Sequence, residues 1–294
     1  MNCGYVAFIG RPNVGKSTLM NHLLRQKISI TSRKPQTTRH RIVGINTTAA
    51  GQAIYVDTPG MHADEEGKAL NRYLNRTADS TLLGVDVVVW LIDGLSFHDY
   101  DEVIFKKLEQ ANLPVILAVN KIDKLKEKAV LLAFFDKAQH RYPFKHMVPI
   151  SALKNTNLIE LEKLIFELLP ESELIYPEDQ VTDRPERFLC AEIVREKLTR
   201  RLGEELPYSL TVEIERFEEL PEIAKIYAII WVERASQKNI VIGKQGDMLK
   251  KIGTDARVDM EKLIGKKVFL QLWVKVKKGW SDNERALQNL GFNE

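Results

Sequence analysis

Short apolar runs alternate with amphipathic segments over the first half of the 294-residue chain. The apolar runs predict buried strands at 5–9, 45–47, 52–56, 85–92, 114–119 and 144–150. Between them, apolar residues at helical spacing predict helices at 16–25 and 102–110, and a closing helix that contains Leu158, Leu161, Ile165 and Leu168. Strands that alternate with helices predict an α/β fold, namely a doubly wound and mostly parallel sheet with ligands at the carboxyl ends of its strands.

The pattern changes after residue 185. An amphipathic helix that ends at Gly203 precedes two alternating strands at 208–216 and 225–233. Two helices follow on either side of residues 243–246, and then come a strand at 268–277 and a short helix at 281–290. This order predicts a smaller α+β domain.

A segment with prolines, several acids and no periodicity separates the two patterns at 171–185. Such a composition is typical of an interdomain linker. We therefore predict a first domain at 1–172, a linker at 173–185 and a second domain at 186–294 that ends in a helix.

The composition is that of a folded protein, because 44% of the residues are hydrophobic and 28% are charged. Cys3 and Cys190 lie far apart in sequence and have no metal or redox spacing, which fits a reducing compartment. No apolar run approaches the length of a membrane span, and the first residues enter a strand without a signal peptide. We therefore expect a cytoplasmic protein, for which peripheral contact with a membrane stays open.

Residues 10–18 have the glycine, lysine and serine spacing of a phosphate-binding loop, between a predicted strand and a predicted helix. Gly10 and Gly15 let backbone N–H groups point inward and form an anion cradle at a helix N-terminus. Lys16 can reach terminal phosphates, and the Ser17 hydroxyl can bind Mg²⁺, which needs few protein ligands. The predicted phosphate-binding residues are Gly10, Arg11, Pro12, Asn13, Val14, Gly15, Lys16, Ser17 and Thr18.

Two further segments supply candidate groups for the metal and the terminal phosphate. Residues 27–44 are polar and lack periodicity, which predicts a long functional loop where Thr37 or Thr38, with Thr38 preferred, closes over Mg²⁺. The strand at 52–56 leads into Asp57, which can bind Mg²⁺ directly or through water, and into Gly60, whose N–H can reach the phosphate. The predicted metal ligands are Ser17, Thr38 and Asp57, and Thr58 and Pro59 complete the nucleotide-contacting segment.

The residues after two later strands are suited to base recognition. Asp123, in the sequence Asn120-Lys121-Ile122-Asp123, can accept two hydrogen bonds from guanine. Adenine would leave this carboxylate without partners, a mismatch of roughly a few kcal/mol. We expect Asn120 to link neighbouring loops and the Lys121 stem to cover the base, and the backbone of Ser151 and Ala152 can reach the guanine carbonyl.

The loop at 243–246 carries the candidate chemistry of the second domain. Gly243 and Gly246 permit close approach of a polynucleotide backbone, and Lys244 can meet a phosphate. Residues 236–280 contain eleven Lys and Arg against four acids, a net charge of +7, whereas the whole chain has +3. This basic module predicts a nucleic-acid or other anionic partner. The predicted residues for binding single-stranded nucleic acid, which the resemblance described next identifies as RNA, include an apolar groove for bases and are Ile240, Ile242, Gly243, Lys244, Gln245, Gly246, Lys250 and Lys251.

In this order the segments resemble a Ras-like GTPase domain, and residues 10–17 and 36–40 resemble the Era branch of the translation-factor-related bacterial GTPases. The second half resembles a type II KH domain, so the resemblance covers the whole chain. It implies a P-loop enzyme that binds Mg²⁺ and converts GTP and water to GDP and phosphate.

One position departs from Ras. Met61 stands where Ras has a glutamine that orients the attacking water, and a methionine cannot do this. His62 can contact a water, although a solvated loop histidine is the simpler interpretation. The resemblance points to Asn13, because related GTPases use such an asparagine with K⁺, whose charge would assist hydrolysis. The predicted catalytic residues are therefore Asn13, Lys16, Thr38 and Gly60.

The resemblance also implies the partners of the second domain. These are single-stranded small-subunit (16S) ribosomal RNA near its 3′ end and the small (30S) ribosomal subunit, in whose assembly and maturation a monomeric protein would act. The alternative is a regulatory GTPase at the inner membrane or division site, whose basic domain binds lipid or protein. The glycine pair between two helices favours RNA.

Overall fold

The computed structural model describes all residues except 35, 61–68, 128, 204–205 and 293–294. The chain forms two compact units. The first comprises Met1–Ser29, Thr38–Glu65 and Leu74–Asp183, and the second comprises Ile30–Thr37, Glu66–Tyr73 and Arg184–Glu294. Two short stretches of the N-terminal half therefore belong to the second unit.

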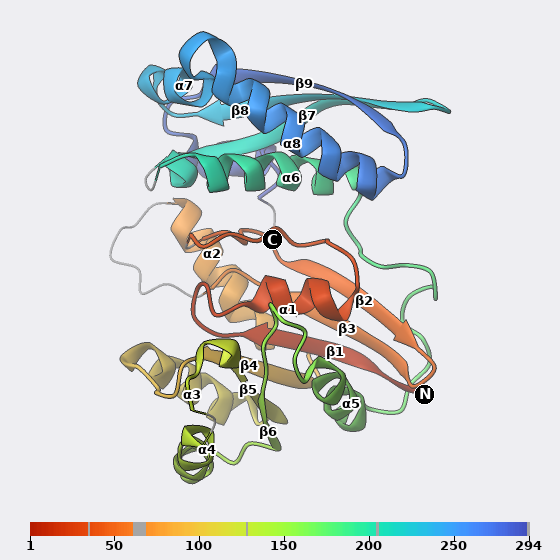
Figure 1. The fold of residues 1–294 in the computed structure, drawn as a ribbon, viewed down its shortest axis with the longest axis vertical. Helices are drawn as coiled ribbons and strands as arrows, with labels where there is room; N and C mark the ends of the chain where they lie inside the picture. The colour runs from red at the N-terminus through yellow and green to blue at the C-terminus, as the bar shows by residue number, and fades with distance from the viewer. Residues whose placement is uncertain (35, 61–68, 128, 204–205, 293–294) are drawn as a thin grey trace. The chain divides into compact units, whose positions relative to one another are not determined.

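A six-stranded sheet forms the centre of the first unit (Figure 1), with the strand order β2-β3-β1-β4-β5-β6. All neighbouring strands are parallel except β2 and β3, which are antiparallel. The predicted doubly wound, mostly parallel sheet is confirmed. The strands are β1 (Asn2–Ile9), β2 (Ile42–Thr48), β3 (Gly51–Asp57), β4 (Val87–Asp93), β5 (Val115–Asn120) and β6 (His146–Pro149).

Helices pack against this sheet. The helices α1 (Lys16–Leu23) and α5 (Leu158–Leu168) contact β3. The helices α3 (Asp99–Ala111) and α4 (Val130–Arg141) bury Phe105 and Phe134 in a cluster with Trp90 of β4. Helix α2 (Ala69–Asp79) is divided, since its residues up to Tyr73 group with the second unit and those from Leu74 with the first. Burying one apolar stripe of each helix removes its hydrocarbon surface from water, which is the main stabilising contribution to such a core.

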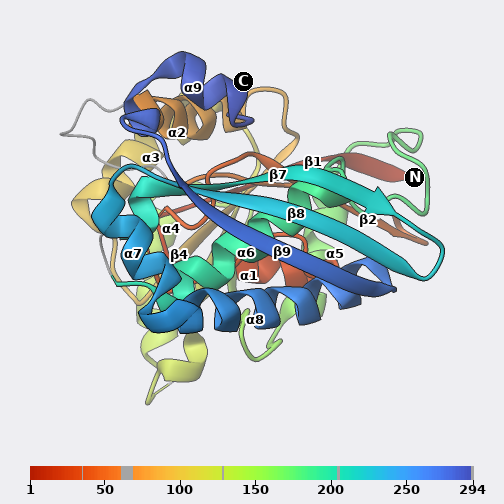
Figure 2. The same ribbon diagram turned by 90° about the horizontal axis from the view of Figure 1, so that it is seen from above.

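The second unit is built on a three-stranded sheet with the order β7-β8-β9. Strands β7 (Leu210–Glu219) and β8 (Ile223–Val232) are antiparallel, while β8 and β9 (Lys267–Val276) are parallel, and Figure 2 shows the three side by side. Helices α6 (Glu186–Arg201) and α8 (Asp247–Ile264) cover one face through a shared apolar core. Helix α7 (Ala235–Ile242) precedes α8, and α9 (Glu284–Asn289) ends the fold.

Several predicted boundaries were wrong. Residues 42–44, expected in a loop, extend β2, because Ile42 pairs with Asp57 and the strand matches the full length of β3. Helix α1 ends at Leu23, two residues early. Helices α2 and α4 were not predicted, although Leu131, Phe134 and Ala138 are buried at helical spacing.

The segment predicted as a linker at 173–185 runs along the first unit. The Gln52 side chain accepts hydrogen bonds from Ile175 N–H and Tyr176 N–H, and Ile45 N–H donates to Val181 O. Residues up to Asp183 group with the first unit for this reason. Among the described residues, no helix combines the length and apolar character needed to cross a membrane.

Candidate nucleotide and RNA sites

The sheet of the first unit gathers the predicted nucleotide-contacting residues at one edge. Gly10 follows β1, Asp57 ends β3, Asn120 ends β5 and Ser151 comes shortly after β6. These four strands run parallel, so their carboxyl ends lie at the same edge. This edge is where ligands bind in open α/β sheets.

Close contacts require glycine at two positions of the phosphate-binding loop. Gly10 has φ 141°, and a Cβ atom there would lie 2.3 Å from the backbone oxygen of Leu91. Gly15 has φ 110°, and its Cβ would lie 2.3 Å from Nδ2 of Asn120. Both the backbone conformation and the space exclude a larger residue.

Lys16 begins α1 and is almost completely buried. Its Nζ donates hydrogen bonds to Gly10 O at 2.9 Å and Arg11 O at 3.1 Å, so it lies across the mouth of the loop. Burial lowers the pKa of Lys16 to about 8, and the charge of Asp57 opposes this shift. An anion in the loop would restore the charged form.

Three oxygen-bearing side chains converge at the predicted metal site. Ser17 Oγ lies 2.7 Å from Asp57 Oδ2 and 2.9 Å from Thr38 Oγ1. Thr37 does not take part, because its hydroxyl contacts Ser32 Oγ at 2.7 Å and donates to Lys34 O at 2.6 Å. The structure therefore brings Thr38, the preferred threonine, to Ser17 and Asp57.

Asp57 fits a cation ligand. Its side chain is fully buried, and within the described part of the chain its Oδ1 has no hydrogen-bond partner. Burial raises the pKa of Asp57, although the hydrogen bond from Ser17 and the charge of Lys16 oppose the shift. One carboxylate and two hydroxyls are the oxygen ligands that Mg²⁺ takes beside waters and phosphates.

Two residues of this site were missed at the level of sequence. The Ser29 hydroxyl donates to Asp57 Oδ2 at 2.8 Å, which adds a hydroxyl to the cluster. Asn21 of α1 fixes Ser29, since its Nδ2 donates to Ser29 O at 2.7 Å and its Oδ1 accepts from Ser29 N–H at 2.9 Å. Neither lies in a recognisable motif.

The segment after β3 lies against the phosphate-binding loop. A Cβ atom at Gly60 would lie 2.9 Å from Pro12 Cγ and 3.0 Å from its nitrogen, so a side chain there would push the loops apart. Thr58 is buried, and Pro59 lies between Thr58 and Gly60 in the sequence. Met61 and His62, which bear on the attacking water, lie outside the described residues.

Asn120 links its own segment to the phosphate-binding loop and to Ala152. Its Nδ2 donates to Val14 O at 2.7 Å, and its Oδ1 accepts from Ala152 N–H at 2.9 Å. Asp123 is exposed at the rim, and Ser151 Oγ donates to one of its carboxylate oxygens at 2.5 Å. One oxygen of Asp123 is thereby oriented while the side chain stays open to a base.

A pair of acids that sequence reasoning did not identify holds the two basic residues beside the loop. Asp93, the last residue of β4, pairs with Arg11 at 3.1 Å and with Lys121 at 2.8 Å. Asp101 of α3 is fully buried 3.8 Å from the Arg11 guanidinium. Lys121 Nζ also donates to Asn13 O at 2.7 Å. The Arg11 guanidinium therefore interacts with these two acids, while its backbone oxygen accepts the hydrogen bond from Lys16.

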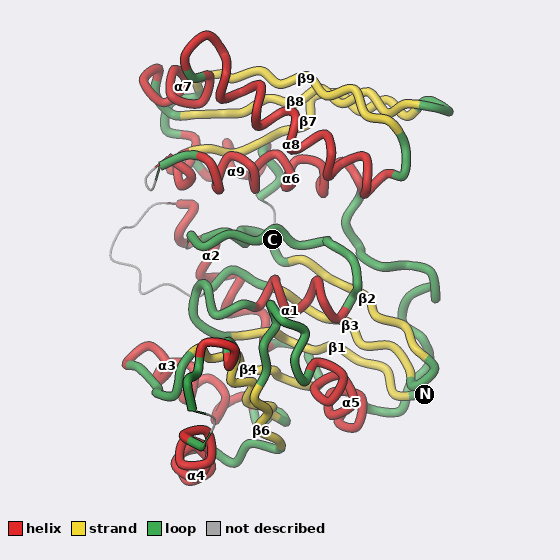
Figure 3. Tube along the Cα trace, viewed as in Figure 1, coloured by secondary structure: helices red, strands yellow, loops and turns green. Residues whose placement is uncertain are grey.

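In the second unit, residues 243–246 form a short turn between α7 and α8 (Figure 3). Gly243 has φ 75° and ψ 178°, and a Cβ there would lie 2.6 Å from Met248 Cβ. Gly246 has φ 82°, but nothing lies within 4 Å of its Cβ position. The exposed side chains of Lys244 and Gln245 lie between these glycines.

The other predicted RNA-contacting residues surround this turn unevenly. Ile240 is 54% exposed on α7, whereas Ile242 is partly buried against the core of the second unit. Lys250 and Lys251 are exposed on the first turns of α8, where Lys251 pairs with Asp247 at 2.7 Å. Among the predicted residues, the turn and its flanking helices therefore offer one exposed apolar residue and three exposed cations.

Comparison with known proteins agrees with this two-part arrangement. The family model for 50S ribosome-binding GTPases matches residues 5–121, and that for KH domains matches residues 205–281. GTPase Era from Marinobacter nauticus is 56% identical over 99% of this chain and 95% of its own length. GTPase Era from Pseudomonas aeruginosa is also 56% identical, with the same coverage of each.

Two solved structures resemble the chain over its whole length. One is Era in complex with MgGDPNP and nucleotides 1506–1542 of 16S ribosomal RNA, and the other is an Aquifex aeolicus Era variant bound to GDP·AlF4⁻. Each has a TM-score of 0.96, is 40% identical and covers 100% of both chains. With such relatives along its full length, the chain belongs to the Era family of GTPases, in which a KH domain follows the GTPase domain.

Proposed function

We propose that the site at the carboxyl ends of the parallel strands binds and hydrolyses Mg²⁺-bound GTP. We also propose that the KH domain binds single-stranded 16S ribosomal RNA near its 3′ end during assembly and maturation of the 30S subunit. The observation that carries the nucleotide part is the convergence of Ser17, Thr38 and Asp57 beside the phosphate-binding loop. A buried carboxylate oxygen without a partner among the described residues supports a cation there.

Each part of the site has a task in this scheme. The backbone of residues 10–18 cradles the phosphates, and Lys16 adds a positive charge that bound phosphates would favour against the burial that lowers its pKa. Ser17, Thr38 and Asp57 would hold Mg²⁺, which supplies charge neutralisation on the phosphates when bound. Gly60 brings its backbone N–H to the terminal phosphate.

Guanine selection rests on Asp123. The carboxylate is exposed at the rim and oriented by Ser151, while Asn120 connects its segment to the phosphate-binding loop and to Ala152. A carboxylate accepts hydrogen bonds from guanine, whereas adenine would leave it unpaired. The nucleotide is therefore GTP or GDP.

Asn13 is our candidate for cation-assisted hydrolysis. It lies exposed in the phosphate-binding loop in a left-handed conformation, with φ 63°, and Lys121 holds its backbone oxygen. An amide oxygen there can help to bind K⁺, whose charge would stabilise the phosphates as their bond breaks. Met61 does not supply the glutamine of Ras, so another source of stabilisation is needed.

The RNA part rests on the turn at 243–246 and on the relative that was solved with both MgGDPNP and 16S ribosomal RNA. Gly246 has open space at its Cβ position, so a polymer backbone can approach the turn closely. The exposed Lys244 and Lys250 add charge for phosphates.

A matched pair of variants tests this proposal. Gly246→Asp places a negative charge at the turn and should weaken binding to a 16S 3′-end oligonucleotide by about tenfold or more, while GTP affinity stays unchanged. Gly265→Asp is the control, because Gly265 has nearly the same φ, 73°, and equally open space, but follows the far end of α8. Equal RNA affinity of both variants and the unchanged protein would contradict the RNA site. Binding to anionic phospholipid vesicles without RNA binding would favour a membrane role instead.

A further inference from the structure

Residues 30–37 belong to the second unit, whereas the residues on either side contact the predicted magnesium ligand Asp57 in the first. Before the segment, Ser29 donates to Asp57 at 2.8 Å. After it, the Thr38 hydroxyl lies 3.5 Å from the same carboxylate oxygen and 2.9 Å from Ser17. Whatever fixes the two ends of this segment therefore also fixes two hydroxyls of the predicted metal site.

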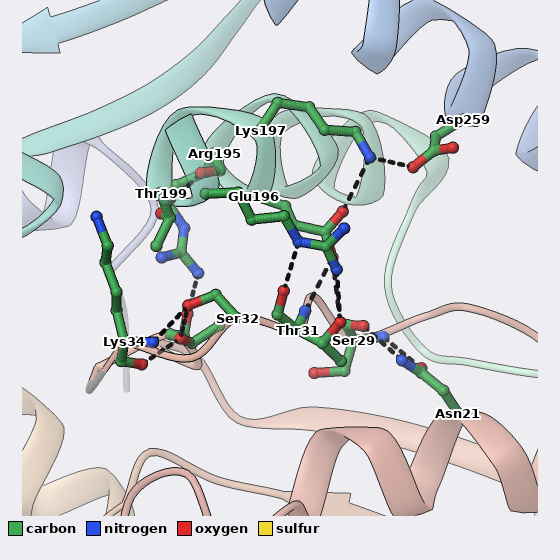
Figure 4. Close-up of polar contacts among 12 residues, drawn as sticks. Asn21, Ser29, Thr31, Ser32, Lys34, Arg195, Glu196, Lys197, Thr199 and Asp259 are labelled. Atoms are coloured by element: carbon green, nitrogen blue, oxygen red, sulfur yellow. Dashed lines mark hydrogen bonds and ion pairs between the residues drawn. The ribbon is translucent and has the colours of Figure 1, made fainter. Parts of the chain in front are cut away.

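Helix α6 holds the first end (Figure 4). Glu196 Oε1 accepts a hydrogen bond from Thr31 N–H at 2.9 Å. Arg200 donates to Thr31 O at 2.9 Å and to Thr31 Oγ1 at 2.8 Å, and it also pairs with Glu196 at 2.9 Å. Glu196 is fully buried, so its carboxylate cannot exchange these partners for water.

Helix α6 holds the other end through the adjacent residue. The Arg195 guanidinium donates to Thr37 O, immediately before Thr38. Glu192 orients that guanidinium with two hydrogen bonds, at 2.7 and 2.6 Å, and Arg195 is only 2% exposed. A bidentate pair of this kind fixes the direction of the remaining donor.

This side of α6 is unusual for a helix that packs on a sheet. The apolar residues of α6, among them Val194 and Leu198, are buried in the core of the second unit, which is the KH unit. Glu192, Arg195 and Glu196 are nevertheless buried as well. Buried charges add little net stability compared with apolar residues, and in some proteins they serve to fix one defined arrangement.

We propose that Arg195 and Glu196 are positioning residues for the GTPase site: they fix both ends of segment 30–37, so that Thr38 and Ser29 stand at Asp57. Neither contacts the nucleotide, and each acts through a backbone group of the segment. A change at either residue would therefore alter how the segment places Thr38 beside Asp57. This inference rests on the proposed binding of Mg²⁺-bound GTP.

The test measures how much Mg²⁺ the full chain needs to bind a non-hydrolysable GTP analogue. Arg195→Met and Glu196→Ala should raise the Mg²⁺ concentration for half-saturation by about tenfold or more, as expected for residues that orient metal ligands. The affinity for GDP in EDTA should not change, because it depends on the phosphate-binding loop and Asp123. A general loss of structure would instead weaken both.

Two conservative variants retain the hydrogen-bonding group, and they keep the test valid if Glu196→Ala does not fold. Arg195→Lys keeps a donor for Thr37 O, and Glu196→Gln keeps an acceptor for Thr31 N–H, so both should shift the Mg²⁺ requirement less than the full truncations. Arg201→Ala is the matched control, because Arg201 lies on the same helix but pairs with Asp255. It should behave as the unchanged protein.

Two negative results have different meanings. If the unchanged protein needs no Mg²⁺ for the GTP analogue, the proposed nucleotide site is wrong. If the unchanged protein needs Mg²⁺ and folded Arg195 and Glu196 variants need the same amount, the nucleotide site stands and the positioning role is overturned.

Discussion

The two glycine-containing loops of this chain differ in what surrounds them. At Gly10 and Gly15 a Cβ atom would lie 2.3 Å from another part of the first unit. In the turn at 243–246, a Cβ atom would lie 2.6 Å from Met248 Cβ at Gly243 but would meet nothing within 4 Å at Gly246. The phosphate-binding loop needs glycine because the protein itself is packed around it. The turn at 243–246 has room at Gly246, where we propose that the RNA approaches.

Charge follows the same division. Lys16 and Asp57 are buried, and hydrogen bonds within the first unit fix their positions. Lys244 and Lys250 are exposed. A small ligand with fixed geometry requires preorganised groups, while a long polyanion gains from mobile surface charges.

The largest effect should be on the free energy of unfolding, when alanine replaces a crowded glycine, Gly10, or an open one, Gly246. Gly10→Ala forces a Cβ against the Leu91 backbone oxygen at φ 141°, and we expect it to lower the free energy of unfolding by about 3 kcal/mol or more. Gly246→Ala has only the left-handed backbone strain to overcome, about 1–2 kcal/mol. Thermal unfolding of the two full-length variants measures this, and equal melting temperatures would remove the distinction.

Asp123→Ala should weaken GDP binding by about 100-fold and reduce the preference for guanine over adenine nucleotides, because the carboxylate would no longer accept hydrogen bonds from the base. RNA binding should stay unchanged in the absence of nucleotide. Titration calorimetry with GDP and ADP checks both statements. A variant that keeps its guanine preference would place base recognition elsewhere.

The pH dependence of nucleotide binding should reveal Lys16. Its pKa in the free protein is lowered to about 8, and bound phosphates favour the charged form, so GTP binding takes up a proton above pH 8. The dissociation constant should therefore rise by up to about tenfold between pH 8 and 9. Lys16→Arg stays charged and should flatten this profile, whereas a slope that persists would assign it to another group.

The lowered pKa of Lys16 also affects the stability of the nucleotide-free protein. Stability should rise with pH, whereas nucleotide affinity should fall. The folded protein holds fewer protons at Lys16 than the unfolded chain between about pH 8 and the ordinary lysine pKa, so the contribution of Lys16 to stability rises with pH over this window.

A smaller effect concerns the monovalent cation. We expect hydrolysis to be several-fold faster in K⁺ than in Na⁺, and Asn13→Ala to remove the difference, because the amide oxygen is the proposed K⁺ ligand. Single-turnover assays at equal ionic strength measure it. Equal rates in the two salts would leave Asn13 as a residue that only shapes the loop.

The sequence was most informative where a function occupies consecutive residues. The phosphate-binding loop, the segment after Asp57 and the tetrapeptide ending in Asp123 each follow a strand, so a local motif locates them. Ser29 and Asp93 contact predicted site residues, and Asn21 holds Ser29, although none of the three lies in a recognisable motif. Nothing in their immediate neighbours signals this, and only the folded arrangement brings them to the site.

Secondary structure shows a related limit. Residues 42–44 looked like the end of a polar loop, and only pairing with β3 makes them a strand. Helix α4 carried a detectable apolar spacing, so its omission was an error of interpretation. The membership of residues 30–37 in the second unit could not be predicted, because it depends on buried charges of α6 more than 150 positions later in the chain.

The most direct test of the whole account is the affinity of the full chain for a 16S 3′-end RNA fragment, measured with GDP and with a non-hydrolysable GTP analogue plus Mg²⁺. We expect nucleotide state and RNA binding to be linked, so the GTP form should bind the RNA about 5- to 150-fold more tightly than the GDP form. RNA should then strengthen the binding of the GTP analogue, relative to the binding of GDP, by the same factor. An RNA affinity that is identical with both nucleotides would contradict the account.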